Sequence, residues 1–512
     1  MQRLVAATAT LLALLIGSAS CLAQAAPRSL EPLGFDDARH LLARTGFAAA
    51  PADIEFFARL TREQAVDRLL PRTASPRVTP PPAWVHEPVT PFSRVRAMST
   101  EERQAWQRNN VARGLDLRGW WLQEMVATPS PLTEKMVLFW HNHFVSSQQK
   151  VRQPQYLYRQ NVLLREHALG NFGAFLHAIA RDPAMVIYLD SASNRKGQPN
   201  ENFAREVMEL FTLGEGHYTE RDIKEAARAF TGWSIDGETG EFLFRAGAHD
   251  DGVKSVLGRI GNLDGDDVLD ILLAQPQTAQ FIVRKLWREF VSTGESADTA
   301  DAGEVARIAG VFRDSQYDIC AALHALFISD AFYAPRHRAT LVKSPVDLVV
   351  GTLRQFQFAP GDVRPLSLVV AQLGQNLFAP PNVKGWPGGE AWINSTTLLA
   401  RKQFLERLFN AADLKGQRPA MMAAGPMQVS APLLNEAVQG APVNAMRQRL
   451  ARAMADMPFD SQSWLRQAGA GGDPVQVQRV VLAMAPQHPL PAGVGGMELL
   501  RRLTQDPVYQ LK

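Results

Sequence analysis

The chain has 512 residues, with 54 basic and 51 acidic side chains and a formal net charge of +3 at neutral pH. This near balance of charge does not indicate the strongly basic surface of a nucleic-acid-binding protein. The length allows two or three domains, or one large domain.

The first 25 residues have the pattern of a secretory signal. Arg3 gives a short positive start, residues 4–16 form an apolar run too short to span a bilayer comfortably, and Ala23-Gln24-Ala25 is a small-x-small cleavage site. We therefore expect an exported protein, periplasmic or extracellular, that is cleaved near Ala25 and has no membrane span in the mature chain. Cys320 would then be its only cysteine, which excludes an intramolecular disulfide.

Helical periodicity dominates the rest of the chain. We expect a mainly α fold: one large multi-helical domain with a small β-hairpin insertion and long ordered loops. Composition divides the chain into an N-terminal helical segment, a proline-rich linker, a main helical core, and a looser segment followed by C-terminal helices. The corresponding ranges are 26–70, 71–95, 96–410 and 411–512.

Residues 233–246 are an exception to the helical pattern. Asp236-Gly237 and Thr239-Gly240 are turn sequences between two short apolar or aromatic runs, which is typical of a β-hairpin. Residues 376–396, rich in Pro, Gly and Trp, are expected to form a long ordered loop.

The stretch LFWHNHFVSS, residues 138–147, contains two histidines in an aromatic setting. On a regular helix, His141 and His143 point roughly 200° apart and cannot bind one metal ion together. Both rings face one side only if the helix ends near His141, and no Pro or Gly is present there to end it. We therefore expect one histidine in a polar pocket and the other in the core. The alternative is one buried, hydrogen-bonded histidine and one packing histidine, without a functional role.

A second polar group lies in NENFAREVMELFTLGEG, residues 200–216. On a helical wheel, its charged and amide side chains share one face, opposite the apolar residues. This face is either part of a reactive pocket or a solvated surface with ion pairs four residues apart. It comprises Glu201, Asn202, Arg205, Glu206 and Glu209.

Two further stretches carry candidate residues. His249 and Asp250 are either metal ligands, an acid/base pair, or turn residues that cap their own backbone. In PPNVKGWPGGEAW, residues 380–392, Trp386 and Trp392 beside Lys384 form either a platform for sugar rings or a peptide, or an anchor that holds the loop on the core.

These stretches resemble the bacterial family called domain of unknown function 1800, and the resemblance covers nearly the whole mature chain. It implies an exported, predominantly helical protein, often encoded beside an exported protein of another uncharacterised family that looks like a sulfatase or phosphatase. That neighbour is therefore an expected partner. The family often has Gly soon after the R-x-G-F of the first helix, where this chain has Ala48-Ala49-Ala50. The matching stretches are 38–47, 131–147, 182–233, 249–258, 343–351 and 373–401.

From these observations we expect a hydrolase-type enzyme that acts on an envelope or extracellular polymer through a polar pocket, with a divalent metal ion or with acid/base chemistry alone. The alternative is a non-enzymatic envelope protein that binds a glycan or a partner, with the polar residues as a structural network. The expected catalytic residues are His141, His143, Glu201, Arg205, Glu206, Glu209, His249 and Asp250; the expected substrate-binding residues are Asn202, Lys384, Trp386 and Trp392.

Overall fold

Helices dominate the computed structural model, which describes residues 31–512 except 71–75, 294–300, 360, 417–442, 456 and 470–472. The mainly α fold expected from the sequence is therefore confirmed. The expected signal segment, residues 1–25, and most of the looser segment after residue 411 lie outside the described residues.

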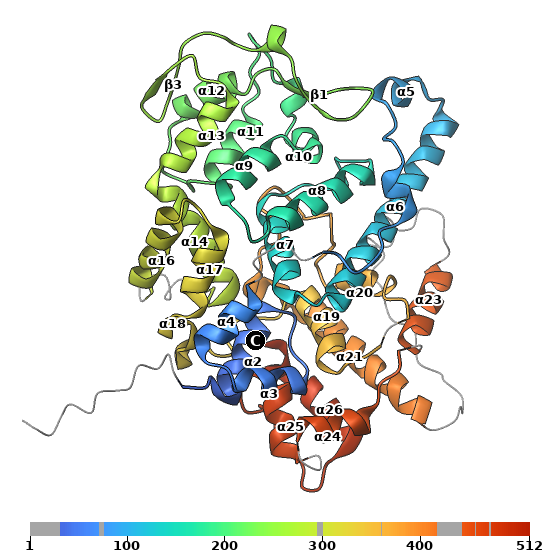
Figure 1. Cartoon of the computed structure of the whole chain (residues 1–512). Coiled ribbons are helices and arrows are strands. Elements are labelled where there is room, and N and C mark those ends of the chain that lie inside the picture. Colours follow the sequence, from blue (N-terminus) through green and yellow to red (C-terminus); the bar gives the residue numbers. More distant parts are fainter. Residues whose placement is uncertain are drawn as a thin grey trace, which may run out of the picture.

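The N-terminal helices lie against the last helices of the chain, at the bottom of Figure 1. Arg479 from the second of those last helices lies 3.1 Å from the Asp36 carboxylate, and Arg39 donates a hydrogen bond to the Ala483 carbonyl. The two ends of the described chain thus pack against each other in one layer of helices. The helices concerned are α2 (Gly34–Thr45), α3 (Pro51–Ala58), α4 (Arg62–Leu69), α24 (Ser461–Ala468), α25 (Pro474–Val481) and α26 (Gly496–Gln505).

Helix α7 lies in the middle of the molecule and packs on α6 and α8 (Figure 1). Of the thirteen residues of α7, all but Pro131 and Asn142 are buried, which explains why its sequence is apolar on most sides. The central helices are α6 (Thr100–Ala127), α7 (Pro131–His143), α8 (Pro154–His167), α19 (Pro345–Gln355), α20 (Leu366–Gln372) and α21 (Ser395–Gly416). Helix α23 (Val443–Ala455) packs on α21 at the right edge of Figure 1.

The upper part of Figure 1 contains short helices and both hairpins. The expected hairpin is present as β1 (Trp233–Ile235) and β2 (Phe242–Phe244), which pair antiparallel. A second hairpin, β3 (Lys254–Val256) with β4 (Arg259–Gly261), was not predicted. The helices of this part are α9 (Phe172–Ala180), α10 (Pro183–Tyr188), α11 (Asn202–Glu209), α12 (Glu220–Ala229) and α13 (Gly265–Ala274).

A further group of helices packs beside α7 on the left of Figure 1. It contains α14 (Pro276–Phe290), α16 (Ala302–Asp314), α17 (Ile319–Phe327) and α18 (Asp330–Tyr333). The remaining elements are single turns or short helices: α5 (Phe92–Ala97), η2 (Ala83–His86), η3 (Ser191–Ser193), η4 (Ala246–Ala248), η5 (Pro335–His337), η6 (Gly389–Trp392) and η7 (Pro507–Gln510).

A buried ion pair joins three of the central helices. Arg165 of α8 donates two hydrogen bonds to Glu134 of α7, at 2.6 and 2.9 Å, and Trp121 of α6 donates a third at 3.0 Å. Both charged side chains are at most 5% exposed. Removing either partner would leave a buried charge unpaired, at a cost of about 3–5 kcal/mol. This contact therefore fixes the register of α7.

The turn after α2 has alanines at residues 48–50, where the resemblance led us to expect a glycine. Its backbone still has a conformation that favours glycine. Ala48 has φ +80°, in the left-handed region that a side chain with Cβ rarely adopts. A Cβ added to Gly351 of α19 would stand only 2.5 Å from the carbonyl oxygen of the preceding residue, Phe47. Helix α19 therefore lies very close to the turn. The tight packing of this turn on α19 explains why the strained conformation persists without glycine.

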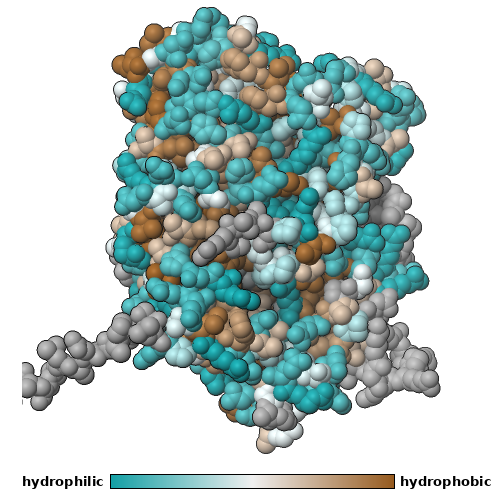
Figure 2. All heavy atoms as spheres, viewed as in Figure 1, coloured by the Kyte–Doolittle hydropathy of each residue, from teal (hydrophilic) through white to brown (hydrophobic). Residues whose placement is uncertain are grey.

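The face of the molecule in Figure 2 is mostly hydrophilic, with apolar groups in small separate patches. Among the described residues, no helix combines the length and the apolar character needed to cross a bilayer.

Candidate functional site

The two histidines of α7 occupy different environments. The helix runs unbroken from Pro131 to His143, so the rings point to different sides, as helical phase predicts. His141 lies in the core, where its ring centroid is 5.3 Å from that of Trp121, 5.4 Å from Phe378 and 5.7 Å from Trp386. Its Nε2 has no hydrogen-bond partner among the residues that the structure describes, and burial lowers its pKa to about 3. His141 is therefore neutral at physiological pH.

His143 is the histidine that faces a cavity. Its Nε2 lies 3.2 Å from the Phe211 carbonyl oxygen, and its Nδ1 lies 2.9 Å from Lys285 Nζ. Because a carbonyl can only accept, Nε2 carries the hydrogen and Nδ1 accepts from the lysine. Burial and the nearby lysine hold the pKa of His143 well below its usual value. The ring is thus a fixed, neutral acceptor for the Lys285 amine.

Lys285, on α14, is the side chain that His143 positions. Its Nζ donates to His143 Nδ1 at 2.9 Å and to the Leu210 carbonyl at 3.2 Å. Within the described part of the chain, no carboxylate pairs with this amine. Burial, and then the charge of Arg288, lower the pKa of Lys285 from 10.5 to about 7. Lys285 can therefore change its protonation state near neutral pH.

Lys285 and His143 line a cavity of about 740 Å³ between α7, α14, the start of α19 and the loop 384–392. The volume is in the range of small-molecule sites. Of the residues proposed from the sequence, His143, Lys384, Trp386 and Trp392 line it, whereas the other eight do not.

A buried network of charges forms one wall of this cavity. Lys135 Nζ lies 2.7 Å from Asp347 and 3.1 Å from Glu289, and Lys512 Nζ lies 2.7 Å from the second Asp347 oxygen. The two lysines hold the pKa of Asp347 well below its usual range despite burial. Two cations and two anions therefore neutralise one another in this wall.

Asn142 holds the loop 384–392 against α7. Its Oδ1 accepts from the Trp386 backbone N–H at 2.7 Å, and its Nδ2 donates to the Trp386 carbonyl at 3.3 Å. Gly385 makes this approach possible because it has φ +82°, and a Cβ there would stand 2.2 Å from Asn142 Oδ1. The asparagine of the H-N-H stretch thus has a defined role: it places one wall of the cavity.

The two tryptophans of this loop do not form an exposed platform. Trp386 is 4% exposed and Trp392 is 7% exposed. Both side chains line the cavity but are buried, so they anchor the loop on the core. The condition for a stacking platform, an exposed ring face, is therefore not met.

The polar face of α11 is divided between two sets of contacts. Arg205 makes two parallel hydrogen bonds of 2.9 Å to Glu220 and one of 3.2 Å to Glu201. Asn202 is exposed and donates to Asp190 at 3.3 Å. These are surface contacts, as in the solvated-face interpretation of the sequence.

Glu206 and Glu209, at the other end of this face, lie close to the loop 384–392. Lys384 Nζ is 3.9 Å from Glu209 and 3.4 Å from Glu215, and Tyr218 donates a hydrogen bond of 2.8 Å to Glu209. Burial and the charge of Glu209 raise the pKa of Glu206. Among the described residues, no hydrogen bond or ion pair joins Glu206 or Glu209 to His141 or His143, so these candidate residues do not form a histidine–carboxylate pair.

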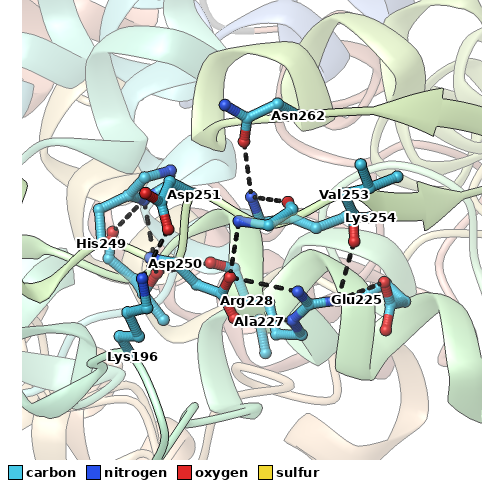
Figure 3. Close-up of polar contacts among 12 residues, drawn as sticks. Lys196, Glu225, Ala227, Arg228, His249, Asp250, Asp251, Val253, Lys254 and Asn262 are labelled. Carbon is cyan, nitrogen blue, oxygen red and sulfur yellow. Dashed lines mark hydrogen bonds and ion pairs between the residues drawn. The ribbon is translucent and has the colours of Figure 1, made fainter.

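His249 and Asp250 form a separate polar cluster beside α12 (Figure 3). Arg228 donates to both oxygens of Asp250, at 2.8 and 3.2 Å, and His249 Nδ1 lies 2.8 Å from the Thr231 carbonyl. The arginine lowers the pKa of Asp250 to about 2. Every polar atom of this carboxylate already has a partner, so the cluster has the character of a turn stabilised by its own side chains.

The part of the chain that the structure describes contains no group of three or more His, Cys, Asp or Glu side chains able to hold a metal ion. The residues that sequence reasoning missed are Asn142 and Lys285. Lys285 follows the pattern of an amphipathic helix, FIVRKLWREF, and its position four residues before Glu289 looks like a surface ion pair. No local signal distinguishes it.

Comparison with known proteins places the chain in a family without assigning an activity. No curated protein and no solved structure matches it. The profile described as "Protein of unknown function (DUF1800)" matches residues 40–511. That range includes every helix of the cavity, so the chain belongs to the DUF1800 family.

Proposed function

We propose that the chain is a hydrolase-type enzyme that acts on an envelope or extracellular polymer, with the cavity of Lys285 and His143 as its reaction site. The single observation that carries the proposal is the geometry of Lys285 Nζ. A neutral amine has two N–H groups, and the two acceptors, His143 Nδ1 and the Leu210 carbonyl, use both. The third position on the nitrogen is then a lone pair in the neutral state and an N–H in the charged state.

This arrangement suits proton transfer in hydrolysis. The charged amine donates its proton to the leaving oxygen as the bond to that oxygen breaks. Water adds its hydroxide to the atom from which the oxygen departs, and the remaining proton of that water returns to the amine. His143 accepts one N–H of Lys285 in both states and so keeps the nitrogen in place. The side chain pKa of about 7 means that both protonation states are populated at neutral pH.

The setting outside the cytoplasm is part of the proposal. It is supported by the positive start, short apolar run and small-x-small site of residues 1–25. An exported sulfatase- or phosphatase-like neighbour is proposed as a partner on the family resemblance alone. A glycan is one polymer that fits this setting.

The test is a screen for hydrolysis of chromogenic esters, chromogenic glycosides and purified envelope polymers. Variants of the chain are then assayed for any activity that the screen finds. Lys285→Met should abolish the activity found. The matched control is Lys343→Met: Lys343 is also a buried lysine with a pKa of about 7, but it packs on the Tyr509 ring and does not line the cavity. Equal activity of the wild type and Lys285→Met would overturn the proposal.

A further inference from the structure

The cationic side chains that line the cavity differ in their partners. Lys135 and Lys512 are neutralised by Asp347 and Glu289, at contact distances of 2.7–3.1 Å. Lys384, which lines the cavity from the loop, lies 3.4 Å from Glu215 and 3.9 Å from Glu209. Lys285 differs from these three lysines, because both of its described acceptors are uncharged.

We infer that the cavity binds an oxyanion group of the substrate against Lys285, and that one proton is taken up with the anion. The inference rests on the proposed function, because it identifies the substrate of that site as an anionic molecule. The shared chemistry is that of a sulfate, phosphate or carboxylate group.

The contacts of Lys285 are the first reason. Both of its acceptors, His143 Nδ1 and the Leu210 carbonyl, are neutral, so no described residue in direct contact compensates the charge of the ammonium form. The nearest carboxylate on its own helix, Glu289, is already bound by Lys135 at 3.1 Å. An anion that enters the cavity supplies the missing counter-charge.

The coupling to a proton is the second consequence of this arrangement. In the empty cavity, burial and Arg288 disfavour the ammonium form, and the pKa of Lys285 is about 7. An adjacent anion favours the charged form, so binding should raise the pKa and draw a proton from solvent. The charged and titratable groups around the cavity are His143 and Lys135 from α7, Arg288 and Glu289 from α14, Asp347 from α19, Lys384 and Glu390 from the loop, and Lys512.

Most of the other groups do not change their charge between pH 6 and pH 9 in a way that would imitate Lys285. His143 has a pKa well below its usual value, and Asp347 likewise, so both keep one protonation state above pH 6. Lys343, whose pKa is also about 7, lies outside the lining. Lys512 does line the cavity, and burial lowers its pKa to about 8, so the loss of pH dependence in Lys285→Arg is what assigns the titration to Lys285.

The test is isothermal titration of the full chain with inorganic sulfate, phosphate and acetate at pH 6 and pH 9, each in two buffers of different ionisation enthalpy. Sulfate is the primary probe because its charge is constant over this range. Its affinity should fall by about tenfold for each pH unit above 7, with uptake of close to one proton at pH 8. The ranking of the three anions at pH 6 distinguishes a sulfate, phosphate or carboxylate group.

Two substitutions separate this site from general effects of salt. Lys285→Arg keeps the charge at every pH, so sulfate should bind with little change in affinity between pH 6 and pH 9. Lys285→Met should bind none of the three anions, whereas Lys343→Met should behave as the wild type. Wild-type affinity that is equal at pH 6 and pH 9, binding without proton uptake, or binding retained in Lys285→Met would each overturn the inference.

The binding test needs no substrate and is therefore independent of the activity screen. If anions bind as described and no hydrolysis is found, the proposed function fails while the anion site stands. If hydrolysis depends on Lys285 but no anion binds, the inference fails while the proposed function stands.

Discussion

Gly385→Ala tests whether Asn142 and the loop 384–392 are held together as the structure indicates. Gly385 has φ +82°, and an added Cβ would lie 2.2 Å from Asn142 Oδ1 and 2.7 Å from the Asn142 carbonyl. The Asn142 carbonyl belongs to the backbone of α7, and the Asn142 Oδ1 is held by the Trp386 N–H, so the loop must move away from α7. The two hydrogen bonds between Asn142 and Trp386 would then break.

The expected loss of stability has two parts. A residue with Cβ in the left-handed region costs roughly 1–2 kcal/mol. The two lost hydrogen bonds add about 1 kcal/mol each. We therefore expect Gly385→Ala to lower the free energy of unfolding by about 3–4 kcal/mol.

Gly197→Ala is the matched control. Gly197 has nearly the same φ, +81°, but an added Cβ there meets nothing within 4 Å. It should lose only the backbone part, about 1–2 kcal/mol. The assay is chemical denaturation of both variants beside the wild type, with amide hydrogen exchange of residues 380–392 as the local measurement. Equal losses of unfolding free energy in the two variants, with unchanged amide hydrogen exchange in that loop, would refute the inference that Asn142 holds the loop against α7.

Three further predictions concern charged side chains. Arg205→Ala should cost less than about 1 kcal/mol in a denaturation experiment, since its pairs with Glu201 and Glu220 lie at the surface; a loss of several kcal/mol would contradict the assignment of this face. The Asp250 carboxylate has its folded pKa lowered from 3.8 to about 2, so it stabilises the fold fully above about pH 4 and this contribution is lost as the pH falls through 2. Asp250→Asn should remove about 2 kcal/mol of stability at pH 7 and much less at pH 2. Lys285→Met should raise the free energy of unfolding by roughly 2–4 kcal/mol at pH 6, because folding penalises the charged form of the lysine. This gain in stability should shrink as the pH rises towards 10.5. A gain that does not vary with pH would contradict the titration of Lys285.

Local patterns predicted those parts of the fold that depend on near neighbours in the chain. The phase of α7 separated His141 from His143, and the Asp-Gly and Thr-Gly turns marked the hairpin of β1 and β2, because both rest on periodicity and turn chemistry. The second hairpin, β3–β4, has strands of three residues like those of β1 and β2. It was missed because its turn is Leu257-Gly258, in which Leu257 has φ +48°, and this pair is not one of the usual hairpin turn sequences.

The site depended on contacts that no local pattern encodes. Lys285 and His143 are 142 positions apart in the sequence, and Asn142 and Trp386 are 244 apart. The composition of residues 200–209 made that helix look reactive, but its Arg205 reaches Glu220 at the surface instead of the cavity. Residue types drew attention to a loop and a histidine-containing helix that line the same cavity, while tertiary packing decided which side chains face one another.

The most direct test of the account is the pKa of Lys285 itself. Its value can be measured by NMR titration of ¹³Cε-labelled lysines in the full chain. Lys285→Arg assigns its signal, and Lys343→Arg and Lys512→Arg assign the lysines with pKa values of about 7 and about 8. The account predicts a midpoint of about 7 for Lys285 in the absence of added anions, and a higher midpoint in saturating sulfate. A midpoint near the ordinary value of 10.5, unchanged by sulfate, would contradict it.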